Sequence, residues 1–461
     1  MKKRRKMLLP LVCIIAAILT SCGNTANNQS EIVIDESTTK ATVHATSAQQ
    51  EQESYQEETT TITERADVAV TFEDVELRNA VCRELGIDSE SAITDAMCES
   101  ITSLECIAED NLISYSTVST LTDLELLPNL ETLIINNLGF SLDTKGINKA
   151  SKLKSVTLIN CDLRDIERIG DISTLEYLKL YSDTSDFVND LSPLSNLTSL
   201  KTLILDSVSE GDDTDLSFLS NLTSLEELCF FSGYEYTPLP FESLPNLKKL
   251  TMLGDPNVIF SQLNNSGLIS SLEYLDIQNT DGIEDDTIRN YVSKCQNAQF
   301  LHLDLDSSIT SPVTSLSGLG ELQNLESLDL NNNNAFEIPC SEYAELSKLS
   351  NLKELIIHSS IDSYEFLNGM NSLEYLTISL KDEMSIGSFS ELPNLKQLTI
   401  NSGSGFYTGS GIDISDIGKF SSLEKLYYSS EVKLKSTAPL DDLPQISAEK
   451  ITHNTYERVL Y

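Results

Sequence analysis

The stretch Leu325-Glu-Ser-Leu-Asp-Leu-Asn-Asn-Asn333 decides the fold, because its spacing Leu-x-x-Leu-x-Leu-x-x-Asn recurs along most of the chain. The same spacing, in more or less complete form, opens at thirteen further positions: Leu130, Leu153, Leu175, Leu200, Leu225, Leu247, Leu272, Ala298, Leu352, Leu373, Leu395, Leu423 and, in a degenerate form, Ile446. These starts divide residues 130–446 into thirteen steps that average about 24 residues. Such regularity indicates one repeating structural unit.

The spacing has a direct physical meaning. Two apolar residues two positions apart, such as Leu328 and Leu330, point to one side of a short β-strand. A second apolar set at three-residue spacing, as at Leu191, Leu194 and Leu197, lies on the return path of the repeat. One coil cannot bury its own apolar side, so neighbouring coils must stack about 4.8 Å apart into a parallel sheet.

Repeats of about 20–29 residues with this pattern are leucine-rich repeats. The sequence therefore predicts an α/β solenoid, a leucine-rich-repeat horseshoe with a parallel concave β-sheet and an irregular, short-helical convex side. The length of 461 residues would ordinarily suggest about three domains, and the repeat replaces them with a single solenoid.

Three segments carry a family resemblance. They are Asp190-Leu-Ser-Pro-Leu-Ser-Asn-Leu-Thr-Ser-Leu200, Asp215-Leu-Ser-Phe-Leu-Ser-Asn-Leu-Thr-Ser-Leu225 and Val70-Thr-Phe-Glu-Asp-Val-Glu-Leu-Arg-Asn-Ala-Val-Cys-Arg-Glu-Leu-Gly86. They resemble the repeats and the lead-in segment of the internalins, bacterial leucine-rich-repeat surface proteins. The resemblance implies a helical N-terminal cap over the first coil. It also departs from the family, because most repeats lack the asparagine that Asn333 supplies in the best copy, so a regular internal asparagine ladder is not expected.

The lead-in segment also reads as a helix from its residues alone. Leu77, Val81 and Leu85 fall at helical spacing, and Gly86 is a helix stop. A second short helix begins at Thr94, an N-cap residue, and leads to an irregular strand at Ile101–Cys106. We therefore assign residues 67–106 to a helical cap with the first irregular repeat, and residues 107–461 to a solenoid of 13–14 repeats.

The first residues predict an anchored protein. A basic cluster precedes the apolar run Met7–Leu19, which would span about 20 Å as a helix, short of the roughly 30 Å of a bilayer core. Residues 1–21 thus form a signal peptide. Leu19-Thr-Ser-Cys22 resembles a bacterial lipobox, which implies a lipidated Cys22 and membrane attachment. The alternative is an ordinary cleaved signal followed by an incidental cysteine.

Residues 22–66 then form a disordered tether. They are rich in Ser, Thr, Asn, Gln and Glu, with Tyr55 as the one aromatic residue, so they contain too little apolar surface to fold. The predicted location is the bacterial cell envelope, with the repeats on the extracytoplasmic side of the membrane.

The charge excludes a class of partners. The chain has 71 Asp and Glu against 31 Lys and Arg, a formal net charge of −40. Removing the signal peptide with its five cations, residues 2–6, leaves 71 against 26, or −45. Such a protein repels phosphate backbones, so no nucleic-acid partner is expected.

Catalytic motifs do not occur. There are four histidines, and the sequence holds no H-E-x-x-H, G-x-S-x-G, phosphate-binding loop or C-x-x-C pair. We therefore predict a protein that is not an enzyme and has no cofactor. Whether Cys82 and Cys98 form a disulfide in the cap is left open.

Residues that flank the inward leucines pave the concave face of the sheet. Six of them form a predicted apolar and aromatic binding patch: Ile159, Tyr177, Tyr181, Ile204, Phe231 and Leu253. Exposed tyrosine and phenylalanine are common anchors of protein recognition. The plainer reading is that these residues are good sheet formers, each solvated singly.

Further along, the concave positions become polar. Asp276, His302 and Asp329 occupy equivalent positions on three adjacent coils. A carboxylate and an imidazole about 4.8 Å apart could share a divalent ion or a proton. A solvated acidic ridge is the simpler explanation, so these residues are weak metal candidates and no metal site is assigned.

These observations favour a lipid-anchored protein that binds another protein, an interpretation the internalin resemblance also implies. The alternative is a lipoprotein that captures a small ligand or metal for a transporter or an envelope process, with Asp276, His302 and Asp329 as its site. A hydrolase would need a nucleophile and base pair, which the sequence does not offer.

The anchor is testable by one substitution. Cys22→Ser removes the thiol that would carry the lipid, so the protein should be released into the medium or remain unprocessed. Fractionation of membranes and medium with an antibody against the repeats measures this. A Cys22→Ser protein that stays processed and membrane-bound would contradict the lipobox assignment.

Overall fold

The computed structural model describes ten stretches of the chain: 67–107, 117–162, 166–181, 190–206, 215–231, 239–278, 282–305, 313–332, 338–402 and 409–451. Apart from Asp67, all belong to one compact unit, Val68–Tyr456. Residues 1–66, with the predicted signal peptide, Cys22 and the tether, lie outside the described residues. Within the described stretches, no helix is both long and apolar enough to cross a bilayer.

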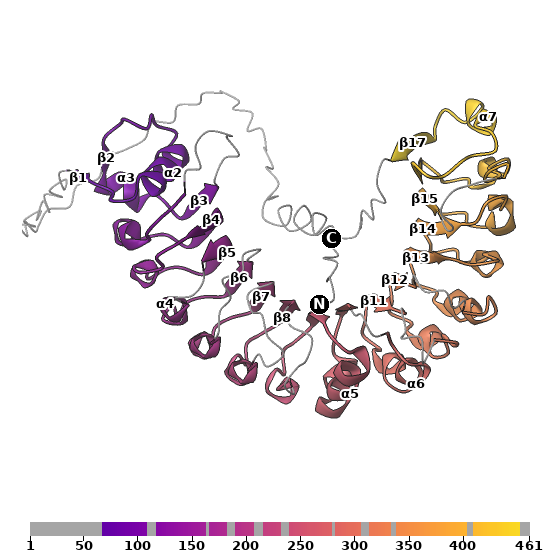
Figure 1. The fold of residues 1–461 in the computed structure, drawn as a ribbon, viewed down its shortest axis with the longest axis horizontal. Helices are drawn as coiled ribbons and strands as arrows, with labels where there is room; N and C mark the ends of the chain where they lie inside the picture. Colours follow the sequence, from indigo (N-terminus) through magenta and orange to yellow (C-terminus); the bar gives the residue numbers. More distant parts are fainter. Residues whose placement is uncertain are drawn as a thin grey trace, which may run out of the picture. The chain divides into compact units, whose positions relative to one another are not determined.

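Fifteen parallel strands form one continuous sheet in chain order, and in Figure 1 they line the inner side of the repeat unit. They are β3 (Ser103–Ile107), β4 (Thr132–Ser141), β5 (Ser155–Asp162), β6 (Tyr177–Tyr181), β7 (Thr202–Asp206), β8 (Glu227–Phe231), β9 (Lys249–Leu253), β10 (Tyr274–Gln278), β11 (Phe300–Asp304), β12 (Ser327–Asn331), β13 (Glu354–Ser360), β14 (Tyr375–Leu380), β15 (Gln397–Ser402), β16 (Lys425–Ser429) and β17 (Ser447–Ile451). Thirteen of the fourteen predicted starts stand two residues before a strand. The predicted leucine-rich-repeat solenoid is confirmed.

The pairing register explains why the leucine pair is needed in every coil. Leu328 of β12 lies opposite Leu301 and Leu355, and Leu330 lies opposite Leu303 and Ile357. All six of these side chains are at most 1% exposed. Each coil therefore buries its apolar pair against the coils before and after it, which a single coil cannot do.

The return paths carry short helices on the outer side of the sheet (Figure 1). Most are 3₁₀-helices: η1 (Thr122–Leu126), η2 (Ile147–Lys149), η3 (Ser192–Asn196), η4 (Ser217–Asn221), η5 (Phe241–Ser243), η6 (Leu268–Ser270), η7 (Val292–Lys294), η8 (Leu319–Glu321), η9 (Glu342–Lys348), η10 (Glu365–Leu367), η11 (Ile386–Phe389) and η12 (Ile417–Lys419). The others are α4 (Glu167–Gly170), α5 (Pro256–Ser266), α6 (Asp285–Asn290) and α7 (Ala438–Asp441). Three-residue apolar spacing suits a 3₁₀-helix, because residues i and i+3 lie on one side of it.

The first described elements precede the large sheet. Strands β1 (Ala69–Val70) and β2 (Ile93–Thr94) pair antiparallel, and helices α2 (Val75–Leu85) and α3 (Asp95–Glu99) follow them in turn. The predicted helix that stops at Gly86 is confirmed, since Gly86 has φ 65° and closes α2. The predicted N-cap Thr94 is also confirmed, because its Oγ1 accepts from the Met97 N–H. The first long strand, β3, starts at Ser103, two residues after the predicted Ile101.

Asp74 joins this helical segment to the repeats. One carboxylate oxygen caps α2 by accepting from the backbone N–H groups of Glu76 and Leu77. The other accepts from Ser119 N–H and Oγ, both at 2.7 Å. Burial raises the pKa of Asp74, but these hydrogen bonds outweigh it and hold the pKa below its ordinary value.

The last strand differs from the others. Ser447 of β17 lies opposite Lys425, so the strand begins one residue after Ile446 rather than two. Its first four residues are exposed, and they include Glu449 and Lys450. Charged residues on a terminal strand disfavour pairing with another chain.

An amide ladder replaces the missing internal asparagines. In six coils the residue before the opening position is Asn, and its side-chain N–H donates to a backbone carbonyl of the preceding coil. These bonds are Asn129 to Glu99 (2.6 Å), Asn246 to Thr223 (2.9 Å), Asn297 to Ser270 (2.8 Å), Asn324 to Gln296 (2.7 Å), Asn351 to Gln323 (2.7 Å) and Asn394 to Asn371 (2.7 Å). The sequence analysis missed this ladder, although the recurring Asn before the opening residue is visible in the sequence.

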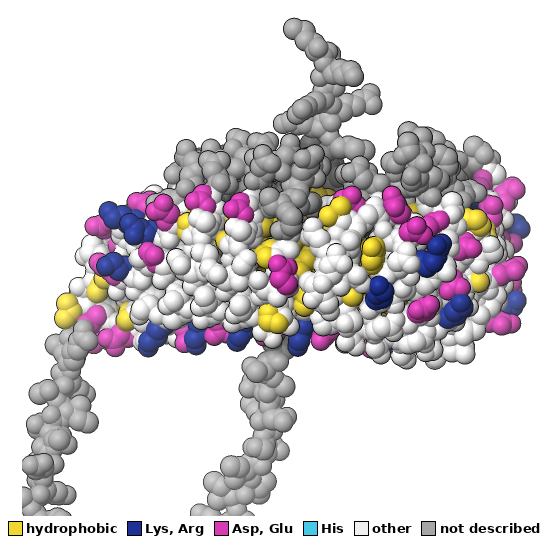
Figure 2. Space-filling view, turned by 90° about the horizontal axis from the view of Figure 1, so that it is seen from below, with side chains coloured by type: hydrophobic (Ala, Val, Ile, Leu, Met, Phe, Trp, Pro, Cys, Tyr) yellow, Lys and Arg dark blue, Asp and Glu magenta, His cyan; other side chains and the backbone are white. Residues whose placement is uncertain are grey.

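A charge ladder follows on the residue after each opening position. It reads Glu131, Lys154, Glu176, Lys201, Glu226, Lys248, Glu273, Gln299, Glu326, Lys353, Glu374, Lys396 and Glu424. Acidic and basic side chains are interspersed along the lower edge of Figure 2. Lys201 lies 2.6 Å from Glu176, and Lys353 lies 2.7 Å from Glu326. Exposed pairs add little stability each, but the alternation keeps like charges apart in a very acidic chain.

The amide ladder predicts a small loss of stability on truncation. Asn324→Ala removes one exposed inter-coil hydrogen bond, so the free energy of unfolding should fall by about 0.5–1.5 kcal/mol. Urea unfolding measures the difference. Asn290→Ala, at an exposed position on α6 outside the ladder, is the matched control and should change stability by less than about 0.5 kcal/mol. Equal losses in both variants would contradict the ladder.

Candidate functional site

The candidate site is the inner face, which we define as the side chains at the first, third and fifth positions of strands β4–β16. The buried leucine pair occupies the second and fourth positions, so the other three point the opposite way. Parallel pairing sets equivalent positions side by side along the sheet, as in β6 and β7, where Tyr177, Lys179 and Tyr181 face Thr202, Ile204 and Asp206.

The predicted apolar patch is interrupted by charges. Ile159 pairs with Tyr181, but Asp206 comes next in the row and separates Tyr181 from Phe231. Ile204, only 7% exposed, lies in the third-position row, opposite Lys179 on one side and Cys229 on the other. The charged residues Lys179 and Asp206 thus lie among the apolar residues of the predicted patch.

The remaining two predicted patch residues, Tyr177 and Leu253, lie in two different rows. Tyr177 occupies the first-position row, opposite Thr202, and Leu253 pairs with Gln278 of β10. Both are partly exposed. The six residues therefore share one face, in three rows, rather than forming one continuous apolar strip.

An aromatic stack lies further along the inner face. The rings of Tyr274 and Phe300, in the first positions of β10 and β11, are stacked with centroids 4.2 Å apart and planes at 11°. Stacking of this kind adds to the stability that burial alone provides.

Next to this stack, the predicted row of Asp276, His302 and Asp329 is present, since His302 lies opposite both carboxylates in register. The His302 Nδ1 atom is 3.1 Å from Asp329 Oδ2, and its Nε2 atom is 3.7 Å from Asp304 Oδ1. The His358 Nε2 atom is 2.7 Å from Asp329 Oδ1. Asp329 thus lies between two imidazoles, one at each carboxylate oxygen.

We name His302, Asp329 and His358 the imidazole cluster. The sequence analysis missed His358 as a member, because His358 is at the fifth position of its strand and Asp329 is at the third. The available signal was the order of coils, in which the two repeat histidines come one before and one after Asp329.

The pKa values of His302 and Asp329 are strongly shifted in this cluster. Burial lowers the pKa of His302, but Asp329, Asp304 and Asp276 outweigh it and raise the pKa well above its usual range. Burial raises the pKa of Asp329, but His302 and His358 hold it well below its usual range. The geometry therefore favours an ion-paired cluster.

Within the described stretches, no group of three His, Cys, Asp or Glu residues is arranged to hold a metal ion. The imidazole nitrogens of His302 and His358 that face Asp329 are engaged with its carboxylate.

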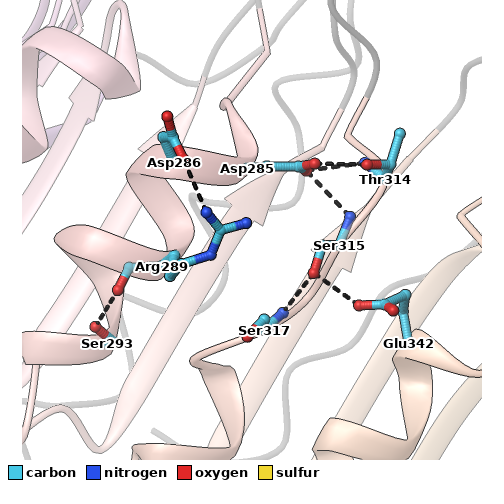
Figure 3. Close-up of polar contacts among 8 residues, drawn as sticks. All are labelled: Asp285, Asp286, Arg289, Ser293, Thr314, Ser315, Ser317 and Glu342. Atoms are coloured by element: carbon cyan, nitrogen blue, oxygen red, sulfur yellow. Dashed lines mark hydrogen bonds and ion pairs between the residues drawn. The ribbon is translucent and has the colours of Figure 1, made fainter.

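A hydroxyl and carboxylate pair on the outer side, beside α6, has a structural explanation. Ser315 Oγ donates to Glu342 Oε2 at 2.7 Å (Figure 3). The same carboxylate oxygen accepts from Leu316 N–H. Asp285 accepts from the N–H groups of Thr314 and Ser315 (Figure 3). These carboxylates bind backbone N–H groups of a neighbouring coil, so they connect coils.

The cysteines in the described part are all free thiols. Burial raises the pKa of Cys106 and Cys295 to about 12, and burial with the Asp95 charge raises that of Cys98 to about 11. A buried, protonated thiol is neither a nucleophile nor a metal ligand. The pairing of Cys82 with Cys98, left open above, is not formed.

Comparisons with known proteins find similarity among solved structures. No protein-family model and no curated protein matches the chain. The internalin InlF of Listeria monocytogenes is 21% identical over 83% of this chain and 96% of its own, with a TM-score of 0.48. The functional domain of InlJ from the same species is 18% identical over 81% and 77%, with a TM-score of 0.47. A plant peptide hormone receptor, RGFR1 in complex with RGF2, is 17% identical over 78% and 56%, with a TM-score of 0.43.

The thiol assignment is testable by alkylation. Denaturation without reductant followed by iodoacetamide should label both Cys82 and Cys98, because neither is in a disulfide. In the native protein at pH 8, Cys106 should resist labelling, since a pKa of about 12 leaves about one thiol in 10,000 ionised. Peptide mass spectrometry measures both results. A peptide joining Cys82 to Cys98 would contradict the structure.

Proposed function

We propose that this protein is a lipid-anchored bacterial envelope protein that displays its leucine-rich-repeat solenoid and binds a protein partner through the inner face. The observation that carries the proposal is the continuous parallel sheet, which sets partly exposed side chains such as Ile159, Tyr181 and Phe231 on one face. A broad, regular face suits an extended protein surface, and tyrosine and phenylalanine are frequent interface anchors.

The anchor part of the proposal rests on the N-terminal sequence. The lipobox-like Leu19-Thr-Ser-Cys22 and the polar tether that follows it would attach the solenoid to the outer side of the cytoplasmic membrane or to the outer membrane. A diacylglyceryl group supplies two acyl chains, which is enough for stable attachment.

We further propose that the protein acts by binding and has no catalytic activity. The thiols with resolved shifts have raised pKa values, and the Ser315 and Glu342 pair is used in a contact between coils. The imidazole cluster contains no nucleophile, because its histidines flank a carboxylate. Capture of a metal for a transporter, the alternative reading of the sequence, is not favoured by this geometry.

The acidity of the chain restricts the charge of the proposed partner. Without its signal peptide the protein has a net charge of −45, and the inner face adds Asp206, Asp276 and Asp329 to its apolar residues. Complementary charge speeds association and selects among partners. The proposed partner is therefore a basic protein, or one that binds through bridging cations.

The binding surface is tested by a double substitution. Tyr181→Ala with Phe231→Ala removes two aromatic anchors on the inner face, so affinity for a captured partner should fall at least tenfold. The melting temperature should change little, because both side chains are partly exposed. Residues 67–461 immobilised on beads would capture the partner from envelope or host-surface extracts, and biolayer interferometry would then compare variants with the identified protein.

The matched control lies on the outer side. Val258→Ala with Tyr291→Ala removes a similar apolar area from α5 and the end of α6, and it should leave affinity unchanged. If the inner-face variant binds as tightly as the control, the aromatic residues of the inner face are not the binding surface.

A further inference from the structure

A stretch of two coils has no permanent positive charge. Residues 295–347 contain no Lys or Arg, but they contain eight Asp and Glu residues. In this stretch the charge ladder has the neutral Gln299 between Glu273 and Glu326, where alternation would require a cation. His302 is the one histidine of the stretch, so it is the only side chain there that can become cationic near neutral pH.

The position of His302 makes that single charge important. The side chain is 9% exposed and lies in register between Asp276 of β10 and Asp329 of β12. Its two ring nitrogens are 3.1 Å from Asp329 and 3.7 Å from Asp304. A protonated His302 therefore has a carboxylate near each ring nitrogen. Residues 295–347 contribute no Lys or Arg to this part of the sheet.

The neighbouring strands contribute the remaining polar groups. From β12, Asn331 donates to Asp304 at 2.5 Å. From β13, His358 lies 2.7 Å from Asp329, and Glu354 accepts from Ser327 Oγ at 2.6 Å. Among the described residues, the titratable groups that face the cluster are thus four carboxylates and two imidazoles: Asp276, Asp304, Asp329, Glu354, His302 and His358.

We propose that His302, with Asp329 and His358 beside it, forms a proton-operated brace of the inner face, which holds strands β10–β13 together while the His302 imidazole is protonated. In that state Asp329 Oδ2 faces an imidazolium, and its Oδ1 lies 2.7 Å from His358 Nε2. When His302 loses its proton, Asp276, Asp304 and Asp329, on strands β10, β11 and β12, lose their shared counter-charge and repel one another. The brace then releases, and this part of the face becomes looser and more negative.

The direction of the pH dependence follows from linkage. The pKa of His302 is raised above 6.5, so its contribution to stability is complete below pH 6.5 and is lost as pH rises through the raised pKa. The pKa of Asp329 is lowered below 3.8, so its contribution is present above pH 3.8 and is lost only below that value. The brace is therefore closed in mildly acidic and neutral solution and opens on the alkaline side.

The brace is tested on the full chain by two measurements. Histidine NMR should give a pKa for His302 above 6.5, and in Asp329→Asn that pKa should fall. Hydrogen exchange, corrected for intrinsic rates, should show strands β10–β13 opening more often above the His302 pKa of the intact protein. For one linked proton, the opening equilibrium should rise by up to about tenfold per pH unit.

Controls separate this brace from general alkaline loosening. Strands β5–β8 should show no such pH dependence, and Lys179→Gln, which removes a cation from the equivalent inner position of β6, should leave the effect on β10–β13 intact. His302→Gln should abolish the effect, and protection of β10–β13 should be low at all pH values. A wild-type His302 pKa at or below 6.5 would overturn the proposal, even if His302→Gln fails to fold. So would opening that is equal along the whole sheet.

Discussion

The structure depends on the need to bury one pair of apolar side chains in each coil. Leu328 and Leu330 pack against the equivalent pairs of the coils before and after, and a buried pair recurs at these positions from β3 to β15. Burying such side chains provides about 1.5–3 kcal/mol each, so a coil without neighbours would lose much of its stability. Stability is thus distributed along the solenoid as a series of contacts between adjacent coils.

Because the coils stack at one spacing, each remaining position of the repeat forms a row along the solenoid. Asparagines before the opening position each reach a backbone carbonyl of the preceding coil and form the amide ladder. The residues after the opening position face their equivalents and form the charge ladder. Like charges in a row would repel one another, and the alternation of Glu176, Lys201 and Glu226 prevents this. Coil 298–324 departs from this alternation, because it has the neutral Gln299 between Glu273 and Glu326.

The same logic relates the inner face to function. The solenoid presents three rows of side chains on its inner face, and the partly exposed ones, such as Tyr181 and Phe231, are available for recognition. Apolar and aromatic residues are frequent on β5–β9, where the charged residues Lys179, Asp206, Glu227 and Lys249 lie among them. Carboxylates and imidazoles prevail on β10–β13, where ion pairing is governed by protonation. A protein partner that spans both parts would meet an apolar region and then an acidic one.

Much of the fold could be read from the chain because the decisive interactions repeat. Thirteen strand positions, the helix that ends at Gly86 and the short helices of the return paths follow from local spacing, since each depends on residues close in sequence. The predicted start of the last strand is wrong by one residue, because this strand lacks the leucine pair that sets the register. The placement of Asp276, His302 and Asp329 in one row on adjacent strands could also be predicted from the repeat alone.

What remained for the tertiary structure was the contact between side chains of different coils. Rotamers and distances decide that Asp329 engages His358 as well as His302, that Tyr274 stacks on Phe300, and that Cys82 and Cys98 do not bond. A one-dimensional repeat specifies which positions lie in adjacent coils, because the period sets the stacking. It does not specify which atoms of those residues meet, because that depends on the rotation of each side chain and on the packing around it.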